Sequence, residues 1–424
     1  METAATPPLR HIARRWFRVA LVLLFVVGIT VAVQWWLERP LSEIRQLLAA
    51  HNYDQALKRI DYYLAQHPDD PRALALKARA MGGLGRDLPA IQIFEQVGVA
   101  TTADVQSLAM AYQRQSIWSR AAAMFEQVVA AEPTNQPALE DLAACQLQLG
   151  SYHDALTTAQ RLSAIPSAAA RGHAWQAFLY QRMEQRAEAI VEFEQAVAAD
   201  PTAANLPTPP QDFFLQQAQV LLAEQRIEES QRALERSLAA QPNADAYVLF
   251  AKIYLQLEQA ESAREFFQKA IQLQSLEPTA REELAAQALR NSKHNEAQSW
   301  LQPLAVNGLI RARTAELMAD TAQLKGDGTT AERWRQRAAT LSRQEKLTTA
   351  IDRLLVRTPN SPNAKIARAH RFAAVGNWRE AQAQLAPLVQ QPPEDAAGRE
   401  IVKQLVNAVQ AQAPLPPLDA LNWD

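Results

Sequence analysis

The sequence of 424 residues carries 45 acidic and 43 basic side chains, a formal net charge of −2, so it gives no basis for bulk electrostatic attraction to nucleic acid. Only 12 residues are glycine, a composition that favours helices over strands joined by tight turns. A single cysteine, Cys145, excludes an internal disulfide and leaves the redox compartment open.

The chain begins with a polar N-terminal tail, residues 1–18, that holds four arginines and one acidic residue. An apolar run follows at 19–37, and its length is close to the roughly 20 residues that a helix needs to cross the hydrocarbon core of a bilayer. Trp16, Trp35 and Trp36 flank the run, where tryptophans anchor helices at membrane interfaces. The sequence therefore predicts one transmembrane helix at 19–37.

The charges around this segment predict its orientation. Arginines precede it, whereas the acidic and basic residues just after it cancel, so the positive-inside rule places the N-terminus in the cytoplasm. The remaining chain would then lie across the inner membrane, in the periplasm of a bacterium, and the lack of Asn-x-Ser/Thr sites favours a bacterial origin. The alternatives are the reverse orientation, a buried core helix, and a signal peptide cleaved near Thr30 and Ala32.

Beyond the apolar run the chain reads as paired amphipathic helices, most clearly at residues 244–277. Tyr247 and Phe250 share one face of the first helix, and the second helix has a similar apolar face. Ala251 and Ala263 stand where the two helices must approach closely, because a larger side chain there would separate them. A helix pair of this size does not bury its apolar face alone, so it needs neighbours.

The same pattern recurs at a period of 34 residues and resembles the tetratricopeptide repeat (TPR), in which small residues, aromatic residues and a closing proline stand at set offsets. The copies are 102–135, with Tyr112, Trp118, Ala121, Phe125 and Pro133; 136–168, with Gly150, Tyr152 and Ala155; 170–203, with Tyr180, Ala189, Phe193 and Pro201; 362–395, with Phe372, Gly376, Trp378 and Pro393; 244–277; a first copy with Tyr53, Ala56 and Pro68; and weaker copies at 71–104, 211–244, 278–309 and 312–345. The resemblance implies an all-α solenoid, a right-handed superhelix of helical hairpins, and a general capacity to bind proteins. It implies no particular partner.

One irregular segment divides the repeats into an N-terminal TPR array at 38–201 and a C-terminal TPR array at 212–395. The intervening residues 202–211 include three prolines and cannot continue a helix. This insertion is either a tolerated surface loop or a hinge between the two arrays.

The C-terminal part departs from the repeat in three places. Near 329–357, helical character runs past the normal repeat end, which predicts one long helix or a helix with an extra turn and helix. Residues 396–412 form an amphipathic capping helix, because a solenoid needs a terminal helix with a polar outer side. The proline-containing residues 413–424 are predicted to be a disordered tail. The alternative is a short docking motif made of Leu418, Leu421 and Trp423.

No constellation of residues supports catalysis, a cofactor or a metal site, so the chain is predicted not to be an enzyme. The seven histidines are scattered, and no two share a helical face at metal-ligand spacing. There is no C-x-x-C, glycine-rich phosphate loop or G-x-S-x-G. Cys145 is predicted to be a buried small apolar residue rather than a reactive thiol, and residues 325–328 a turn.

The resemblance also implies a binding surface, because the first helix of each hairpin lines the concave side of a TPR superhelix. The positions mapped to that side hold Arg79, Arg114, Phe178, Arg182, Gln219, Lys252 and Arg290, among others. Together they would make a mixed polar groove with several cations, suited to a peptide that offers carboxylates and a few apolar anchors. The plainer interpretation is that these are solubilising residues on a hydrated face.

Two functional hypotheses follow. The first is a membrane-anchored TPR scaffold that binds partner proteins for an envelope or secretion assembly, with no catalysis of its own and no nucleic-acid partner. The second is an accessory subunit of a polysaccharide synthesis or export complex, or of another membrane enzyme complex. A glycan-binding groove would favour exposed aromatic residues at consecutive concave positions, where the sequence offers mainly Phe178.

Overall fold

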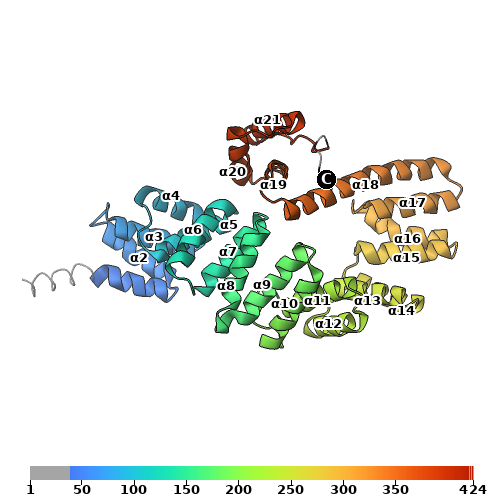
Figure 1. Cartoon of the computed structure of the whole chain (residues 1–424), viewed down its shortest axis with the longest axis horizontal. Coiled ribbons are helices and arrows are strands. Elements are labelled where there is room, and N and C mark those ends of the chain that lie inside the picture. Colours follow the sequence, from blue (N-terminus) through green and yellow to red (C-terminus); the bar gives the residue numbers. More distant parts are fainter. Residues whose placement is uncertain (1–38, 420, 422, 424) are drawn as a thin grey trace, which may run out of the picture. The chain divides into compact units, whose positions relative to one another are not determined.

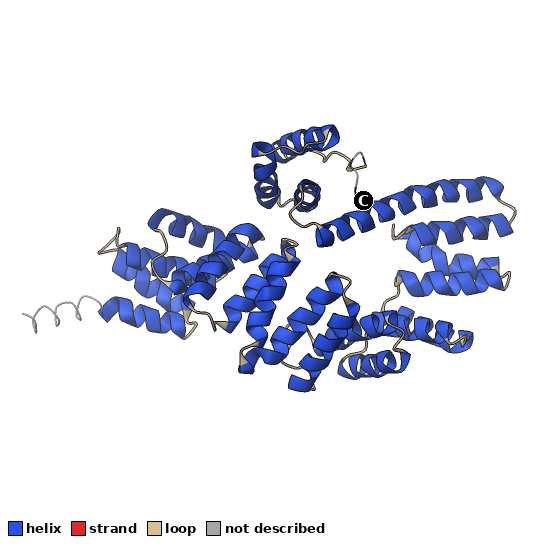
Figure 2. Cartoon of the chain, viewed as in Figure 1, coloured by secondary structure: helices blue, strands red, loops and turns tan. Residues whose placement is uncertain are grey.

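The computed structural model describes residues 39–419, 421 and 423. The predicted N-terminal tail (1–18) and transmembrane helix (19–37) lie outside these residues. Within the part that is described, the chain forms helices, turns and loops and no strand (Figure 2). None of the helices there combines the length and apolarity needed to cross a bilayer.

The helices follow one another as hairpins along the chain (Figure 1). After a helix over residues 39–49, they are α2 (Tyr53–Leu64), α3 (Pro71–Gly83), α4 (Asp87–Val97), α5 (Thr102–Arg114), α6 (Trp118–Ala131), α7 (Gln136–Gln148), α8 (Tyr152–Ser163), the short 3₁₀ helix η1 (Pro166–Ala168), α9 (Ala169–Arg182), α10 (Arg186–Ala199), α11 (Pro210–Ala223), α12 (Ile227–Ala240), α13 (Ala244–Gln256), α14 (Ala260–Leu273), α15 (Pro278–Arg290), α16 (His294–Val306), α17 (Ala312–Leu324), α18 (Gly328–Arg357), α19 (Pro362–Ala374), α20 (Trp378–Gln390) and α21 (Ala396–Ala411).

Each turn between the two helices of a hairpin contains one residue with positive φ. These residues are His51, Gly85, Ser116, Gly150, Glu184, Gln225, Glu258, Ser292, Gly326 and Gly376, and most successive pairs are separated by the repeat spacing of 34 residues. Glycine takes this backbone conformation at little cost, whereas the other residue types are strained in it. The turn therefore repeats as a fixed backbone geometry even where its sequence does not contain glycine.

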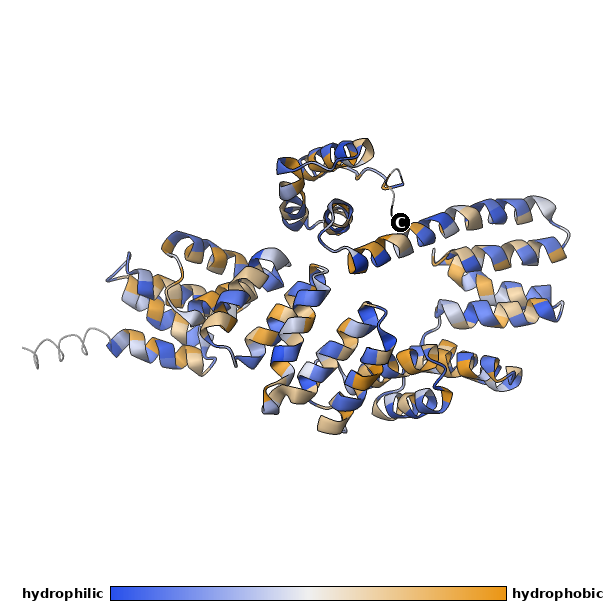
Figure 3. Cartoon of the chain, in the orientation of Figure 1, coloured by the Kyte–Doolittle hydropathy of each residue, from blue (hydrophilic) through white to orange (hydrophobic). Residues whose placement is uncertain are grey.

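Several hairpins begin with a capping side chain followed by a proline. Asp70 accepts a hydrogen bond from the first turn of α3, and Pro71 is the first residue of that helix. Ser361 and Pro362 take the same two roles in α19. The cap satisfies a free N–H group, and proline tolerates the first helical position because its missing N–H is not needed there. Figure 3 shows hydrophilic and hydrophobic residues along the same helices, as amphipathic packing requires.

Small buried residues bring the paired helices together, as the sequence predicts. Ala251 of α13 and Ala263 of α14 are fully buried, and they lie in one hydrophobic cluster that also contains Phe267. Ala189 of α10 is likewise fully buried. Cys145 on α7 is fully buried, and burial, with smaller contributions from nearby carboxylates, raises the pKa of its thiol to about 12. It is a core residue.

The chain divides into two compact units, one ending at Gln115 and the other beginning at Ser116. In the first unit the helix over residues 39–49 packs with α2 and α3 around Leu41, Ile44 and Ile60. In the second unit one cluster runs from α9 to α13. This cluster includes Ala203 from residues 202–211, so apolar packing continues across the insertion.

The long helix predicted near 329–357 is α18, a single helix of 30 residues. Its N-terminal half buries Ala331 and Ala338, and its C-terminal half buries Ile351 and Leu355. The latter two belong to the cluster that α19, α20 and α21 form. A single helix thus serves two neighbouring packing units, which displaces the last hairpin from the regular repeat.

The last hairpin contacts the first helices of the same unit. Glu380 of α20 is fully buried, and its Oε2 accepts hydrogen bonds from the backbone N and the Oγ of Ser119 at 3.2 and 3.0 Å. The side chain of Asn377 donates to the carbonyl of Ser116 at 2.6 Å. Arg368 of α19 also approaches the turn between α7 and α8: a Cβ atom added to Gly150 would lie 3.5 Å from the Nη1 atom of Arg368. The second unit therefore closes on itself through α6 and α20.

The C-terminal tail differs from the predicted disordered segment. Leu418, Leu421 and Trp423 are buried within the cluster formed by α18 to α21. The indole N–H of Trp423 donates to the carbonyl of Leu418 at 2.9 Å, which closes a short loop. Prolines stop the helix, but they do not prevent an extended segment from packing against its neighbours.

Candidate functional site

Two of the seven predicted groove residues, Arg79 and Arg114, line one hollow in the first unit. It has a volume of about 290 Å³ and lies between the helix over residues 39–49, α3 and α5. These are first helices of consecutive hairpins. The lining residues are Leu48, Ala49, His51, Tyr53, Arg79, Gly82, Gly83, Ala103, Gln106, Ser107, Met110 and Arg114, and we call this set the α3–α5 hollow.

Ion pairs within the chain hold both arginines. The Nε atom of Arg114 donates to Oδ1 of Asp87 at 3.0 Å, and its Nη2 atom donates to the same oxygen at 2.6 Å and to the carbonyl of Gly82 at 2.9 Å. Asp87 is only 5% exposed. Arg79 lies 4.0 Å from the buried Asp104. The predicted excess of cations is therefore offset by acidic partners that sequence spacing alone did not identify.

The glycines on α3 let side chains of α2 and α5 approach its backbone closely. A Cβ atom on Gly83 would lie 2.4 Å from the ring of Tyr53, so this position requires glycine for the two helices to approach. A Cβ on Gly82 would lie 3.4 Å from Oγ of Ser107, on the neighbouring helix α5. Met110 of α5 is 38% exposed. The hollow thus combines the hydroxyl of Ser107, the amide of Gln106 and one adaptable apolar side chain, Met110.

The other predicted groove residues do not join this hollow. Phe178 is half-buried in the core, where its ring packs edge-on against Phe193 and Phe213 at centroid distances of 5.7 and 6.0 Å. It is a packing residue rather than an exposed anchor. The remaining four are exposed on successive first helices α9, α11, α13 and α15; they are Arg182, Gln219, Lys252 and Arg290.

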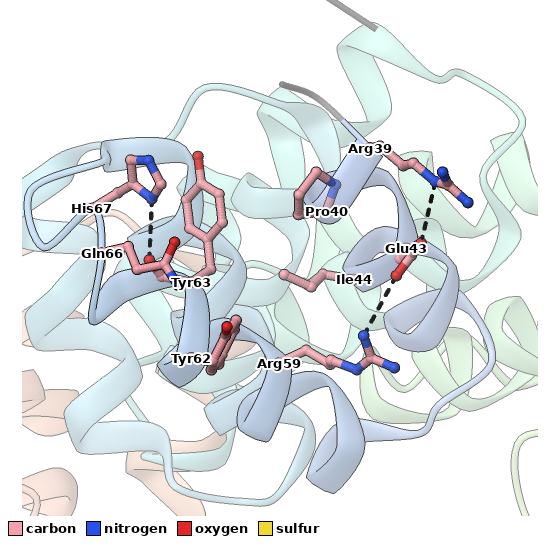
Figure 4. Close-up of a pocket in the computed structure, with 9 residues that line it drawn as sticks. All are labelled: Arg39, Pro40, Glu43, Ile44, Arg59, Tyr62, Tyr63, Gln66 and His67. Atoms are coloured by element: carbon pink, nitrogen blue, oxygen red, sulfur yellow. Dashed lines mark hydrogen bonds and ion pairs between the residues drawn. The ribbon is translucent and has the colours of Figure 1, made fainter. Parts of the chain in front are cut away.

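A larger hollow of about 520 Å³, which the repeat pattern did not predict, lies between the helix over residues 39–49 and α2. Its lining residues are Arg39, Pro40, Glu43, Ile44, Arg59, Tyr62, Tyr63, Gln66 and His67 (Figure 4), and we call it the α2 hollow. The consecutive aromatic residues Tyr62 and Tyr63 at the end of α2 were the available signal. The first repeat has no preceding hairpin in the described chain to cover this side.

The α2 hollow has an aromatic wall and a charged rim. The ring of Tyr63 stacks on that of His67 at 4.5 Å, and its hydroxyl donates to Asp70 at 3.0 Å. Burial and the Asp70 carboxylate raise the pKa of Tyr63, so its hydroxyl remains a donor at neutral pH. Tyr62 is 72% exposed. Arg39 and Arg59 lie 3.7 and 3.6 Å from the Glu43 carboxylate, as Figure 4 shows.

Family models match several parts of the chain. The model described as the N-terminal TPR repeats region of Psidin matches residues 38–169, and two models described as tetratricopeptide repeats match 170–202 and 215–278. No curated protein matches the sequence.

Solved structures of TPR proteins are similar to parts of the chain at low identity. A tetratricopeptide-repeat protein from Parabacteroides merdae is 15% identical, with 58% of this chain and 96% of that chain covered and a TM-score of 0.39. The C-terminal part of a TPR protein from Cytophaga hutchinsonii is 13% identical, covering 56% and 97%, with a TM-score of 0.46. Pseudomonas aeruginosa PilF is 14% identical, covering 51% and 97%, with a TM-score of 0.41. The assignment itself rests on the matched repeats and on the helical hairpins described above, and by these the chain belongs to the tetratricopeptide-repeat family.

Proposed function

We propose that the protein is a membrane-anchored scaffold that binds a segment of a partner protein in the α3–α5 hollow. The observation that carries this proposal is that exposed Met110 lies with the side chains of Gln106 and Ser107 in one hollow between first helices. TPR repeats generally mediate protein interactions. In the described chain, the α3–α5 hollow is a surface of this kind, formed by the first helices of three hairpins. We assign the protein no catalytic role.

The chemistry of the hollow indicates how such a segment is held. Because Asp87 and Asp104 accompany the two arginines, net attraction for carboxylates is weak. The Gln106 amide and the Ser107 hydroxyl, which line the hollow, favour hydrogen bonds to the backbone and polar side chains of the ligand. Met110 adapts to an apolar anchor. We therefore expect binding that depends only modestly on salt concentration.

The membrane anchor of this proposal is the apolar segment 19–37, with the N-terminus in the cytoplasm of a bacterium and the repeats in the periplasm. Its support is the sequence: the length of the apolar run, the flanking tryptophans and the arginines before it. Anchoring confines scaffold and partner to a thin layer next to the membrane, which raises their effective concentration without new contacts. An envelope or secretion assembly is the setting in which this arrangement is useful.

Site-specific photo-crosslinking tests the partner-binding surface. A photoreactive amino acid placed at Met110, inside the hollow, is compared in intact cells with one at Leu88, which is 50% exposed on α4, the second helix of the preceding hairpin. We expect adducts with proteins of one assembly from position 110 and few from position 88. Equal yields of protein adducts from the two positions, or adducts with glycans alone, would contradict the proposal.

Protease accessibility tests the anchor separately. In spheroplasts the repeats should be digested by added protease, and the protein should stay in the membrane fraction after a high-salt wash. Deletion of residues 1–38 should release it. Complete protection of the repeats from protease would show the opposite orientation. Release of the full-length protein by the salt wash would contradict the membrane anchor, and the partner-binding test would be unaffected.

The α2 hollow supports a second candidate function, the accessory subunit of a polysaccharide or other membrane enzyme complex. Exposed Tyr62 beside Tyr63 offers aromatic faces for a sugar ring, and Glu43, Arg59 and Gln66 offer hydrogen bonds to its hydroxyl groups (Figure 4). Saturation-transfer NMR with bacterial envelope oligosaccharides tests this function. A saturation-transfer signal that disappears in Tyr62→Ala and persists in Leu88→Ala would favour the accessory-subunit function over the scaffold function. An absence of signal with the intact chain would exclude the accessory-subunit function.

A further inference from the structure

The C-terminal tail lies on the last hairpin in the manner of a bound peptide. The chain reverses at Gln412, which has a φ of +50°, and the backbone N of Ala413 donates to the carbonyl of Ala408 at 2.9 Å. Leu418, Leu421 and Trp423 are buried, and the backbone N of Leu421 donates to the carbonyl of Leu418 at 3.2 Å, which makes a turn. In Figure 1 this segment follows α21 and ends at the C mark.

The surface under the tail is formed by helices that have their own core. Leu418, Leu421 and Trp423 share a hydrophobic cluster with Ile366 and Ala369 of α19 and with residues of α18, α20 and α21. His370 of α19 bonds through Nε2 to the carbonyl of Pro416 at 3.1 Å. The tail therefore shows two features of peptide recognition in a groove: a contact to the backbone of the bound segment and apolar anchors.

The composition of the tail suits reversible docking. Three prolines at 414, 416 and 417 fix φ, so the segment loses little conformational entropy when it binds. Its buried anchors are two leucines and one tryptophan, and Leu415 packs partly buried against the same cluster. Among the described residues, His370 contacts the tail backbone, and the indole of Trp423 bonds within the tail, to Leu418. Because the anchors are apolar, a competing segment with similar side chains can make the same contacts.

We propose that the groove on the last hairpin is a peptide-binding site that the protein's own C-terminal tail occupies, and that a partner protein binds there by displacing the tail. The partner segment would contain proline and would place leucine and tryptophan anchors as Leu418, Leu421 and Trp423 do. Because the tail is tethered, its effective concentration at the groove is in the millimolar range, so the resident tail suppresses weak binders.

Peptide binding in trans tests this proposal. The probe is a fluorescein-labelled synthetic peptide with the sequence of residues 413–424, and the two proteins are the full-length chain and a chain truncated after Gln412. Fluorescence anisotropy should show saturable binding to the truncated protein and affinity at least tenfold weaker for the full-length protein. A peptide carrying Leu418→Ala and Trp423→Ala is the matched control and should not bind. No binding to a folded truncated protein would overturn the proposal.

A second variant covers failure of the truncated protein to fold. The full-length chain with Leu418→Ala, Leu421→Ala and Trp423→Ala keeps every backbone atom of the tail but removes its anchors. It should retain the helical circular dichroism of the parent and bind the labelled peptide. If both variants unfold, the tail is an integral part of the core and the proposal is wrong. If the full-length protein is a dimer and the truncated protein is a monomer, the groove is occupied by the tail of a second copy. That result would overturn the proposal that each chain binds its own tail.

Discussion

Small side chains determine how closely the helices of a hairpin approach. Ala251 and Ala263 are fully buried on the two facing helices α13 and α14, and Phe267 fills the space beside them. Close-packed interiors of this kind have no room for added volume. The repeat therefore depends on the absence of side-chain atoms at these positions as much as on the presence of the aromatic residues.

Replacing Ala251 with phenylalanine should lower the free energy of unfolding by about 1–3 kcal/mol, because the larger ring overpacks the contact between α13 and α14. Urea denaturation followed by circular dichroism measures the change. Gln256→Phe is the matched control, since this residue is exposed on the same helix and should stay within about 0.5 kcal/mol of the parent. Equal stability of all three proteins would contradict the packing described here.

The thiol of Cys145 provides a pH-dependent prediction. Burial raises its pKa to about 12, so folding favours the neutral thiol over the thiolate. This contribution to stability is fully present below the pKa of the unfolded thiol, about 8.5, and is lost as the pH rises towards 12. Ellman's reagent at pH 8 should therefore modify the native protein on the order of 1,000-fold more slowly than the urea-unfolded protein.

Comparison with Cys145→Ala isolates this contribution from the other groups that titrate at high pH. The variant should lose less stability between pH 9 and 11 than the parent protein. Rapid modification of the native thiol would show that Cys145 is accessible and would contradict its place in the core.

At the scale of elements, α18 joins two packing units that a loop would otherwise connect. Ala331 and Ala338 are buried near its start and Ile351 and Leu355 near its end, while residues 343–346 between them are exposed. In this central turn the Glu345 carboxylate accepts a hydrogen bond from the backbone N of Ala312 at 2.9 Å, and the continuity of the helix relies on its own backbone hydrogen bonds.

A proline at the centre of α18 should therefore separate these units. Arg343→Pro removes a helical hydrogen bond and introduces a clash with the preceding turn, at a cost of about 3 kcal/mol. Hydrogen exchange should show lost protection on both sides of residue 343, with the α19–α21 cluster opening more often. Arg343→Ala keeps the helix and should leave the exchange pattern unchanged; equal effects of the two substitutions would argue that charge rather than helix continuity is responsible.

At the scale of the molecule, the closure of the second unit depends on a buried carboxylate. Glu380 accepts hydrogen bonds from Ser119 in the first turn of α6, where the partial positive charge of a helix N-terminus favours an anion. Asn377 reinforces the contact through the Ser116 carbonyl. The two sides are 261 residues apart in the sequence, so this contact restricts how far the intervening hairpins can open.

A double-mutant cycle tests this closure. Ser119→Ala and Glu380→Ala should show a coupling energy of about 0.5–3 kcal/mol, because each substitution removes a partner of the other. Ser119→Ala combined with Arg379→Ala, an exposed neighbour of Glu380, should be additive within about 0.5 kcal/mol. Additive effects in the first cycle would mean that α6 and α20 do not meet in solution.

The sequence by itself determined the features that repeat or that depend on neighbours along the chain. The 34-residue period, the buried alanines, the long helix near 329–357 and the core position of Cys145 all follow from helical spacing, which a linear pattern records. The predicted membrane segment is also of this local kind, although the described residues do not include it.

Only the tertiary structure decided which distant groups meet. Arg114 pairs with Asp87, which lies 27 residues before it, and this contact offsets the charge predicted for the groove. Phe178 turned out to pack in the core, and the tail docked through Leu418 and Trp423 despite its prolines. In each case the outcome depends on which surface lies opposite in space. Helical periodicity tells which face of a helix is apolar, but it does not tell what covers that face.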